Sequence, residues 1–404
     1  MPDSVLRFIK RVIPKSVFVF FQPAYHLFLA WLAAMIRGFP SLRLKVIGVT
    51  GTSGKTTTVE MLFKIFSEAG FRVAAMDGLY SRILNKTENN LLKMTMPGRF
   101  RIQKFLSEAK KAGCEYVFLE VTSEGIKQFR HRFIKFYAAI FTNLSEEHLE
   151  AHGGFENYRA AKGELFKIAP IAVLNGDDPS FEYFYKLPAR PAGGSPKEKI
   201  VYVSRDFPGD LVLKIKGEFN KMNAVAALAF AKREGVDPRI SKKALAGIDV
   251  LPGRMEFIET NKGFNILIDY AFLPQTLRKT YETVSANDRK NLVCVLGAAG
   301  GGRDKWKRPA LGDAAAQFCR KVFVTNEDPY DDDPLKIIDE VAGTHNFEKI
   351  LDRREAIRAA LKSAGPGDTV VITGKGAEPW IIGPNGTKIA WDDREAVKEE
   401  LKKL

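Results

Sequence analysis

Short apolar runs alternate with amphipathic stretches along most of the chain after Pro40. In the first half, the apolar runs of strand length are Lys45–Val49, Tyr116–Val121, Ala138–Thr142 and Ile171–Leu174. Stretches with helical periodicity lie between them, among them Thr56–Ala69, Arg101–Ala112 and Phe155–Ile168. Strands that are apolar along their whole length are typical of a parallel sheet with both faces covered. The pattern therefore predicts an α/β fold.

A second set of such strands follows Pro252. Its members are Ile266–Ile268, Leu292–Leu296, Val322–Thr325 and Val370–Thr373, with helical stretches between them. Pro252 and Gly253 interrupt the pattern, so we place a boundary near Asp249–Arg254. We expect an N-terminal segment of residues 1–40, a central domain of residues 41–250 and a C-terminal Rossmann-like domain of residues 251–404.

The composition is that of a soluble globular protein, with 45% hydrophobic and 27% charged residues in 404. Such values exclude a disordered, collagenous or polytopic membrane chain. The 62 Lys and Arg exceed the 48 Asp and Glu by 14, and this net charge of +14 favours an anionic partner. Nucleic acid is the least favoured one, because no recognised nucleic-acid-binding motif or aromatic-interleaved basic stripe is present.

The three cysteines are Cys114, Cys294 and Cys319. A sparse, odd set in apolar runs argues against a disulfide framework, and no Cys/His spacing resembles a zinc site. We therefore expect unpaired cysteines and a reducing, cytoplasmic location.

Residues 16–36 carry no Asp, Glu, Lys or Arg, and basic residues flank this run on both sides. The run is just long enough to cross a bilayer, but it contains Pro23 and several polar side chains. Three interpretations stay open: a helix packed on the protein's own body, an interfacial anchor at the inner face of a membrane, or a true span.

The clearest chemical motif is the run Gly48–Thr57, which contains Gly51, Thr52, Ser53, Gly54, Lys55, Thr56 and Thr57. A strand leads into a glycine-rich turn, and Gly-Lys-Thr opens a helix. Backbone N–H groups of such a loop surround phosphate, the lysine reaches the terminal phosphates, and the threonine hydroxyl is suited to Mg²⁺. Val49 stands where the usual template has a glycine, so this is a variant phosphate loop, and it predicts ATP or GTP binding.

This variant loop resembles that of the Mur ligase family, ATP-dependent amino-acid ligases of peptidoglycan precursor synthesis. Further segments resemble family motifs in the same order: Glu120–Ser123, Thr142–Gly153, Ala161–Phe166, Asn175–Pro179, Gly217–Asn223, Pro252–Glu256, Asp269–Ala271, Gly301–Asp304, Lys307–Pro309, Gly374–Glu378 and Asp392–Glu395. Their order is similar to that of the branch that adds the third stem-peptide residue. The resemblance covers residues 45–404.

The resemblance implies ATP, Mg²⁺ and a set of site residues. Lys55, Glu120, His148 and Lys162 would be catalytic; Thr56, Glu120, His148 and a carbamylated Lys162 would hold the metal. Asn220, Asn223, Arg254 and Asp269 would join the phosphate loop in binding ATP. Thr95, Thr122, Ser123 and Arg130 would bind the acceptor, and Arg303, Glu327, Asp328, Tyr330, Gly374 and Glu378 the amino acid. Taken singly, each has an ordinary alternative: Lys162 as a solvated helix lysine, or Asn220 and Asn223 as helix-bracing residues.

Departures from the family pattern concern the substrates. Forty basic and apolar residues precede the resemblance where related enzymes carry a uridine-nucleotide domain, which they cannot replace. Tyr330 stands where the family has an arginine that recognises the distal carboxylate of diaminopimelate. Losing such a bidentate contact disfavours diaminopimelate, and the acidic pair Glu327–Asp328 suits an amine-bearing side chain such as lysine.

We therefore expect a ligase that uses ATP to join an amino acid to a peptidoglycan-precursor-like acceptor through an acyl phosphate. Two alternatives remain: a ligase of the folylpolyglutamate- or cyanophycin-synthetase type acting on another acceptor, and a membrane-attached ATP-binding protein without ligase chemistry. The sequence leaves open the acceptor, the amino acid and the oligomeric state.

Overall fold

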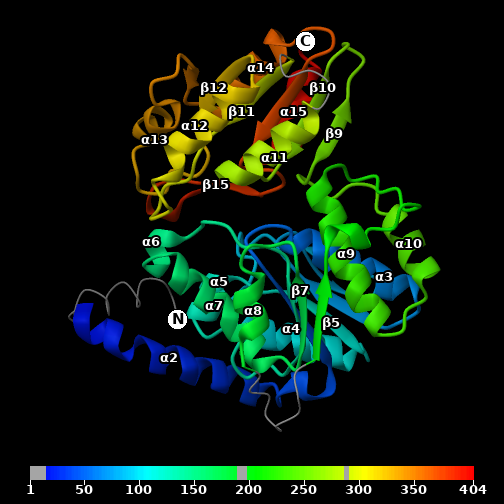
Figure 1. The fold of residues 1–404 in the computed structure, drawn as a ribbon. Helices are drawn as coiled ribbons and strands as arrows, with labels where there is room; N and C mark the ends of the chain where they lie inside the picture. The colour runs from blue at the N-terminus through cyan, green and yellow to red at the C-terminus, as the bar shows by residue number, and fades with distance from the viewer. Residues whose placement is uncertain (1–14, 189–197, 286–290) are drawn as a thin grey trace.

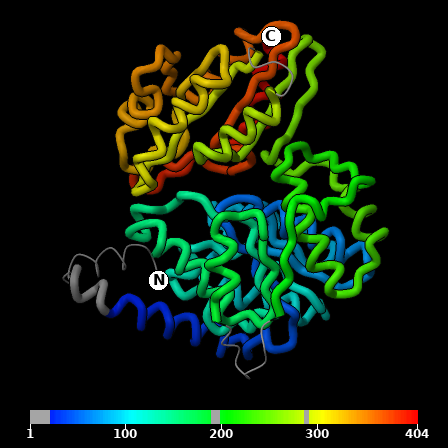
Figure 2. The backbone as a smooth tube through the Cα atoms, in the orientation of Figure 1, coloured from blue at the N-terminus to red at the C-terminus, as the bar shows by residue number. Residues whose placement is uncertain are grey.

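The computed structural model describes residues 15–188, 198–285 and 291–404, and it contains two α/β units, one above the other in Figure 1. The first unit is built on an eight-stranded sheet and the second on a six-stranded sheet. The backbone trace passes from one unit to the other after helix α10, Pro238–Ala246 (Figure 2). The second sheet begins with strand β9, Glu256–Glu259. The expected α/β class is confirmed.

The first sheet has the strand order β4-β3-β2-β5-β1-β6-β7-β8. These strands are β1 Lys45–Thr50, β2 Val73–Met76, β3 Tyr80–Ile83, β4 Lys86–Asn89, β5 Tyr116–Glu120, β6 Phe136–Phe141, β7 Ile171–Asn175 and β8 Glu198–Tyr202. The four strands expected from the sequence are present, and all pairings among β2, β5, β1, β6, β7 and β8 are parallel. β3 and β4 form an antiparallel hairpin at one edge, which the apolar pattern did not indicate because their side chains are only partly buried or exposed.

Helices cover both faces of this sheet, as the apolar strands predict. Ile47 of β1 packs in one core with α3 (Lys55–Glu68), α9 (Glu218–Arg233) and α10, whereas Val46 packs in a second core with α4 (Arg99–Lys111) and α7 (Phe155–Ile168). Neighbouring residues of a strand point to opposite faces, so a strand covered on both sides has no polar side. The shorter helices of the unit are η1 Pro40–Arg43, α5 Ser123–Lys127, α6 Leu149–His152, α8 Phe181–Lys186 and η2 Ser204–Asp206.

The second sheet has the order β13-β12-β11-β14-β10-β9 and is parallel except for β9. Its strands after β9 are β10 Asn265–Asp269, β11 Leu292–Leu296, β12 Lys321–Thr325, β13 Glu348–Ile350 and β14 Thr369–Thr373, followed by the hairpin β15 Trp380–Ile382 and β16 Lys388–Ala390. Its helices are α11 Pro274–Val284, α12 Lys307–Phe318, α13 Pro334–Ala342, α14 Arg353–Ser363, η3 Pro384–Gly386 and α15 Asp393–Leu401. α11, α12 and α13 cover one face and α14 and α15 the other, which agrees with the Rossmann-like expectation.

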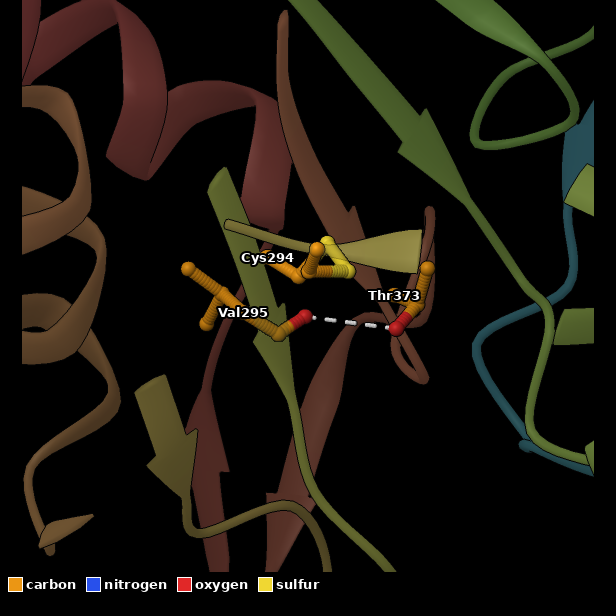
Figure 3. The surroundings of a disulfide bond; sticks show 4 residues. Cys294, Val295 and Thr373 are labelled. Carbon is orange, nitrogen blue, oxygen red and sulfur yellow. Dashed lines mark hydrogen bonds between the residues drawn. A yellow bond between two sulfur atoms is a disulfide. The ribbon is translucent and has the colours of Figure 1, made fainter. Parts of the chain in front are cut away.

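The cysteines correct one expectation. Cys294 on β11 and Cys319 directly after α12 form a disulfide, with their Cα atoms 6.0 Å apart, and only Cys114 is free. Figure 3 shows this disulfide beside the hydrogen bond that the Thr373 hydroxyl donates to the Val295 carbonyl, 3.2 Å long. The expectation of unpaired cysteines was wrong for these two because the packing of α12 on β11 brings together residues 25 apart in the chain.

The apolar segment near the N-terminus forms helix α2, Lys15–Ile36, which contains Pro23 and packs against α4. Its buried side chains include Ala30, Ala33 and Ala34. The helix therefore packs on the body of the protein, as one of the three interpretations proposed. Within the described residues, no helix has the length and hydropathy that crossing a membrane requires.

Candidate active site

A cavity of about 400 Å³ lies where the two units face each other. Most of the site residues expected from the sequence line it: Thr52, Ser53, Gly54, Lys55, Thr56, Thr57, Thr95, Glu120, Thr122, Ser123, Arg130, His148, Lys162, Asn220, Asn223, Arg254, Asp269, Arg303, Glu327, Asp328 and Glu378. Gly51, Tyr330 and Gly374 are not part of its wall but stand directly behind it, as described below. Residues more than 300 positions apart in the sequence thus face one space.

The phosphate loop links β1 to α3, and its shape is held by close packing. At Gly54, which has φ of 80°, a Cβ atom would lie 2.2 Å from Asn223 Oδ1, so only glycine fits. Asn143 Oδ1 accepts hydrogen bonds from the backbone N and the hydroxyl of Ser53, at 3.0 and 3.1 Å. The Lys55 ammonium folds back onto the Gly51 and Thr52 carbonyls, at 3.1 and 2.7 Å. The loop is thus arranged around the N-terminus of α3, where phosphate is favoured.

Thr56 and Glu120 bring two oxygen donors together beside this loop. The Thr56 hydroxyl donates to Glu120 Oε2 at 2.7 Å, the Gly78 backbone N donates to the same oxygen at 3.1 Å, and Lys55 Nζ lies 3.8 Å from Glu120 Oε1. Both side chains are buried. Hydroxyl and carboxylate oxygens are ligands that Mg²⁺ prefers.

Within the described part of the chain, no three or more His, Cys, Asp or Glu side chains gather into a group that could hold a metal alone. Thr56 and Glu120 still fit Mg²⁺, because that ion commonly takes one or two protein ligands and completes its shell with water and substrate phosphates.

Lys162, on α7, is fully buried under the phosphate loop. Its ammonium donates to the Gly51 carbonyl at 2.7 Å and lies 4.6 Å from the centre of the Tyr158 ring. Burial and then the positive charge of Lys55 lower the pKa of Lys162 well below its ordinary value. The ordinary alternative, a solvated helix lysine, is therefore excluded by its burial.

His148 belongs to a small polar group with Glu147 and Tyr158. Its Nε2 lies 3.4 Å from Glu147 Oε1, and the Tyr158 hydroxyl donates to Glu147 Oε2 at 3.2 Å. Burial lowers the pKa of His148 even though Glu147 opposes the shift. Burial would raise the pKa of Glu147, but positive charge nearby, including that of Lys55, holds it below its ordinary value. The imidazole is thus neutral and the carboxylate charged near neutral pH.

Asn220 and Asn223, expected to join the phosphate loop in binding ATP, lie at the start of α9. Asn223 donates to Asn220 Oδ1 at 3.1 Å, and Asn220 donates to the Lys216 carbonyl at 2.8 Å. The bracing role named as the alternative is therefore present, while both amides also line the cavity.

Arg254 and Asp269 enter the cavity from the second unit. Arg254 donates to the Thr56 hydroxyl at 3.4 Å and stacks over the Tyr270 ring, with 4.5 Å to its centre. Asp269 accepts from the Met255 backbone N at 2.8 Å and from the Thr280 hydroxyl at 3.2 Å, and burial raises its pKa. Arg254 thus reaches the side chains around the phosphate loop, while Asp269 is held by its own unit.

The residues expected at the acceptor end gather around α5. Thr122 caps this helix by accepting from the Gly125 backbone N at 3.1 Å. Arg130 donates to the Met96 carbonyl and, at 2.6 Å, to Gln128 Oε1. These contacts leave the Arg130 guanidinium in the cavity wall with Thr95 and Ser123.

At the amino-acid end, most charged side chains are paired with one another. Lys375 donates to both oxygens of Asp328, at 3.0 and 3.1 Å, and to Glu378 at 2.7 Å. Asp328 also accepts from the Ile382 backbone N at 2.8 Å and from Lys93. The Lys93 ammonium lies 2.9 Å from Glu378 Oε2. Asp328 of the expected acidic pair Glu327–Asp328 therefore already contacts two ammonium groups of the chain, and Glu378 contacts the same two.

Glu327, Arg303 and Tyr330 complete this end. Glu327 is buried, its pKa is raised by burial, and within the described residues its Oε2 has no hydrogen-bond partner. That oxygen would lie 2.3 Å from a Cβ at Gly374, so this glycine makes room for it. Tyr330 lies against Arg303. Burial would lower the pKa of Arg303, but the Tyr330 hydroxyl raises it. Glu327 is thus an acid at this end with one carboxylate oxygen that accepts no hydrogen bond from the described residues.

Contacts between the units close the cavity on one side. Asp304 accepts from the backbone N atoms of Leu149 and Glu150, at 3.1 and 3.0 Å, at the start of α6. The Lys305 backbone N donates to Glu150 Oε1 at 2.9 Å.

Among the groups that the structure places in or against the cavity, several had no role predicted from the sequence, including Lys93, Glu147, Tyr158 and Lys307. Glu147 and Lys307 lie within segments that resemble family motifs. Their closeness in sequence to His148 and Arg303 could therefore have indicated that they belong to the site. No sequence pattern indicated Lys93, because its partner Asp328 is 235 residues away in the chain.

Comparisons with known proteins find matches to both units of the chain. Residues 49–231 match the Mur ligase middle domain, and residues 253–376 match the domain described as "Mur ligase, glutamate ligase domain". A UDP-N-acetylmuramoyl-L-alanyl-D-glutamate--2,6-diaminopimelate ligase of Syntrophomonas wolfei is 35% identical, over 93% of this chain and 81% of its own. A UDP-N-acetylmuramyl-tripeptide synthetase of Roseiflexus is also 35% identical, over 93% and 82%.

Solved structures extend the comparison. A UDP-N-acetylmuramoyl-L-alanyl-D-glutamate--2,6-diaminopimelate ligase superposes with a TM-score of 0.55 and 28% identity, covering 89% of this chain and 78% of the other. A bifunctional folylpolyglutamate synthase/dihydrofolate synthase of Yersinia pestis shares the fold, with a TM-score of 0.68 and 18% identity over 86% and 90%. The chain belongs to the Mur ligase family and is an ATP-dependent ligase that forms carbon–nitrogen bonds.

Proposed function

We propose that this ligase joins an amino acid, lysine or another amine-bearing one, to the terminal carboxylate of a peptidoglycan-precursor-like peptide. The observation that carries the proposal is the single cavity that holds the phosphate loop, the Arg130 end and the Arg303–Glu378 end together. A ligase of this kind needs ATP, an acid and an amine within reach of one another.

The reaction proceeds in two displacements. An acceptor carboxylate oxygen attacks the terminal phosphorus of ATP, a P–O bond breaks, and ADP leaves from an acyl phosphate. The neutral amine nitrogen then attacks the acyl carbon, the C–O bond to phosphate breaks, and the nitrogen releases one proton to phosphate or solvent. Lys55 and the α3 N-terminus stabilise the transferring phosphate, and Arg254 adds positive charge from the second unit.

We propose that Thr56 and Glu120 hold Mg²⁺, with His148 and modified Lys162 beside them. When bound, the ion neutralises charge that develops on the phosphates. The residues of this chain orient the site: Gly78 and Thr56 fix the Glu120 carboxylate, and Glu147 fixes the His148 ring.

Lys162 is proposed to carry a carbamate. Burial lowers the pKa of its amine, which favours the neutral form, and the neutral amine can add to CO₂, forming an N–C bond and releasing one proton. The product is an anion beneath Lys55, where a free ammonium would repel metal. Carbon-13 bicarbonate should give a carbamate NMR signal in the wild type that Lys162→Met lacks; a signal of equal intensity in both would refute the modification.

The amino-acid preference rests on Lys93. Its ammonium occupies the space between Asp328 and Glu378, and an incoming side-chain ammonium would replace it there. Tyr330 offers no cation for a distal carboxylate. With Tyr330→Arg, diaminopimelate should gain on lysine; a better rate with diaminopimelate in the wild type, unchanged by Tyr330→Arg, would contradict the lysine preference.

A substrate panel tests the function as a whole. Purified protein is given ATP and Mg²⁺, each of several amino acids, and UDP-linked muramoyl dipeptide or tripeptide, with a folate acceptor as the other arm. Phosphate release that requires both acceptor and amino acid, and that Glu120→Gln abolishes, supports the proposal. Turnover with folate alone, or none with any muramoyl peptide, would refute it.

We further propose that the enzyme works in the cytoplasm, at the inner face of the membrane, with residues 1–40 in contact with that surface. Fractionation of cells that produce a tagged form, with and without high salt, checks this location.

A further inference from the structure

Helix α2 reverses the usual distribution of side chains on a surface helix. Its small side chains Ala30, Ala33 and Ala34 face the body of the protein, while large apolar ones face solvent. Phe28 is 55% exposed and Ile36 60%, and Tyr25, Leu27, Trp31 and Met35 are among the further exposed apolar side chains of the helix. We call these six side chains the α2 surface. A contiguous exposed apolar patch of this kind marks a binding face.

The charged residues that adjoin the α2 surface in the sequence are all basic. Arg37 and Arg43 are exposed at its C-terminal end, and the sequence has no Asp or Glu between Asp3 and Glu60. Exposed Leu42 lies between these arginines, and the Lys135 backbone N donates to the Ser41 hydroxyl at 3.0 Å, which places another exposed cation beside them. Trp and Tyr with an apolar stripe and a basic rim fit the interface of an anionic bilayer.

A short chain of contacts connects this surface to the active site. His26 of α2 lies 3.0 Å from the Arg99 guanidinium, through its Nδ1. Arg99 donates to the Gln128 carbonyl at 2.8 Å, and the Gln128 side chain accepts from Arg130 at the acceptor end of the cavity. The α2 surface therefore lies on the acceptor side of the molecule.

We infer that the α2 surface docks on an anionic membrane and that the acceptor is anchored in that membrane through a phosphate-linked apolar chain. Resting on the proposed function, this inference adds the physical state of its acceptor. Aromatic side chains enter the headgroup layer, Arg37 and Arg43 meet lipid phosphates, and Arg130 receives an acceptor presented at the same surface. A second copy of the chain would also cover an apolar face, but an interface between two such rims would bring cations together.

Vesicle flotation tests the docking. The full chain is mixed with vesicles of phosphatidylcholine alone or with added phosphatidylglycerol, as wild type, as Phe28→Glu/Trp31→Glu and as the control Leu335→Glu, whose exposed leucine lies on α13. We expect the wild type and the control to float with the anionic vesicles, less so at high salt, and the double variant to lose roughly tenfold or more in partitioning. Circular dichroism checks that the variants fold.

Two outcomes would overturn the docking. Wild type that floats with neither vesicle type, or a double variant that floats as well as the control, shows that the α2 surface does not bind lipid. If wild type instead forms a dimer in solution that the double variant dissolves, the face is a protein interface.

The acceptor part is tested by phosphate release. One muramoyl peptide acceptor is supplied water-soluble, and the same headgroup is supplied on a phosphate-linked alkyl chain in anionic vesicles. We expect the wild type to favour the anchored form and the double variant to lose that preference while keeping its rate on the soluble form. Equal use of both forms by the wild type overturns the anchored acceptor. If neither form supports turnover, the proposed function fails, and flotation still decides the docking.

Discussion

Two fully buried lysines, one in each unit, have opposite surroundings. Lys375 is enclosed by Asp328, Glu378 and the Trp380 carbonyl, the last at 2.6 Å. Lys162 contacts the Gly51 carbonyl and the Tyr158 ring, and within the described residues no carboxylate lies within salt-bridge distance of it. The exposed fraction of the residue is 0% for Lys375 and 1% for Lys162, so burial alone does not distinguish them.

The difference indicates what each lysine does. Lys375 is a charged group whose neutralising partners were buried with it, which ties β14, β15 and the loop after β12 together. Lys162 is a buried amine with no carboxylate at salt-bridge distance among the described residues, so burial favours its neutral form, and a neutral amine is reactive. The same substitution at both positions separates the two cases.

The largest effect on stability is expected from Lys375→Met. Removing this cation leaves Lys93 as the one ion-pair partner of Asp328 and Glu378 among the described residues, and breaking a buried ion pair costs about 3–5 kcal/mol. Urea unfolding should show a loss of that size relative to the wild type. An unchanged midpoint would mean that Lys93 alone neutralises the two acids.

Lys162→Met is the matched change and should act on catalysis instead. Methionine fills nearly the same volume and needs no partner, so the free energy of unfolding should stay within about 1.5 kcal/mol of the wild type. ATP-dependent phosphate release should fall by about 10²–10³, the usual effect of removing one stabilising group from a transition state. A variant with near-normal turnover would show that Lys162 is only a packing residue.

Lys93→Met sharpens the comparison at the amino-acid end. Lys93 shares its acids with Lys375 and competes with the incoming ammonium, so its removal should lower KM for lysine by roughly threefold to tenfold with kcat nearly unchanged, because the change acts on ground-state binding. Steady-state kinetics with varied lysine measures this. A higher KM would show that Lys93 helps to bind the amino acid.

His131 offers a third buried base and the smallest effect. Burial lowers the pKa of this imidazole from 6.5 to about 3, and neither ring nitrogen has a hydrogen-bond partner among the described residues. Between these values the unfolded chain binds a proton that the folded chain does not, so stability falls as pH decreases, by at most about 1.4 kcal/mol per pH unit. His131→Leu should flatten the dependence of the unfolding free energy on pH in this window. If the unfolding free energy of the wild type and of His131→Leu changes equally with pH, carboxyl groups alone determine this pH dependence.

The sequence predicted the parts of the site that motifs hold in short segments. Gly54, Lys55 and Thr56 follow a buried strand directly, so their place at its carboxyl end could be foreseen. Lys162 could be named from a motif, but its burial could not, because it depends on Tyr158 and the loop above it.

Features that join distant segments were not foreseen. Asp328 looked free because neither Lys93 nor Lys375 is near it in sequence, and the disulfide arises from helix packing. The hairpin β3–β4 was missed since its exposed side chains give no apolar run.

Asp304 has a consequence for how the two units move. α6 has four residues, and its own N-cap, His148, makes no side-chain capping bond and has φ of 55°. The cap comes from Asp304 in the other unit. Asp304 thus caps α6 across the interface between the two units. Separation of the units would leave the first N–H groups of α6 exposed to water. The geometry of His148, the histidine proposed as catalytic, therefore depends on the same contact that joins the two units.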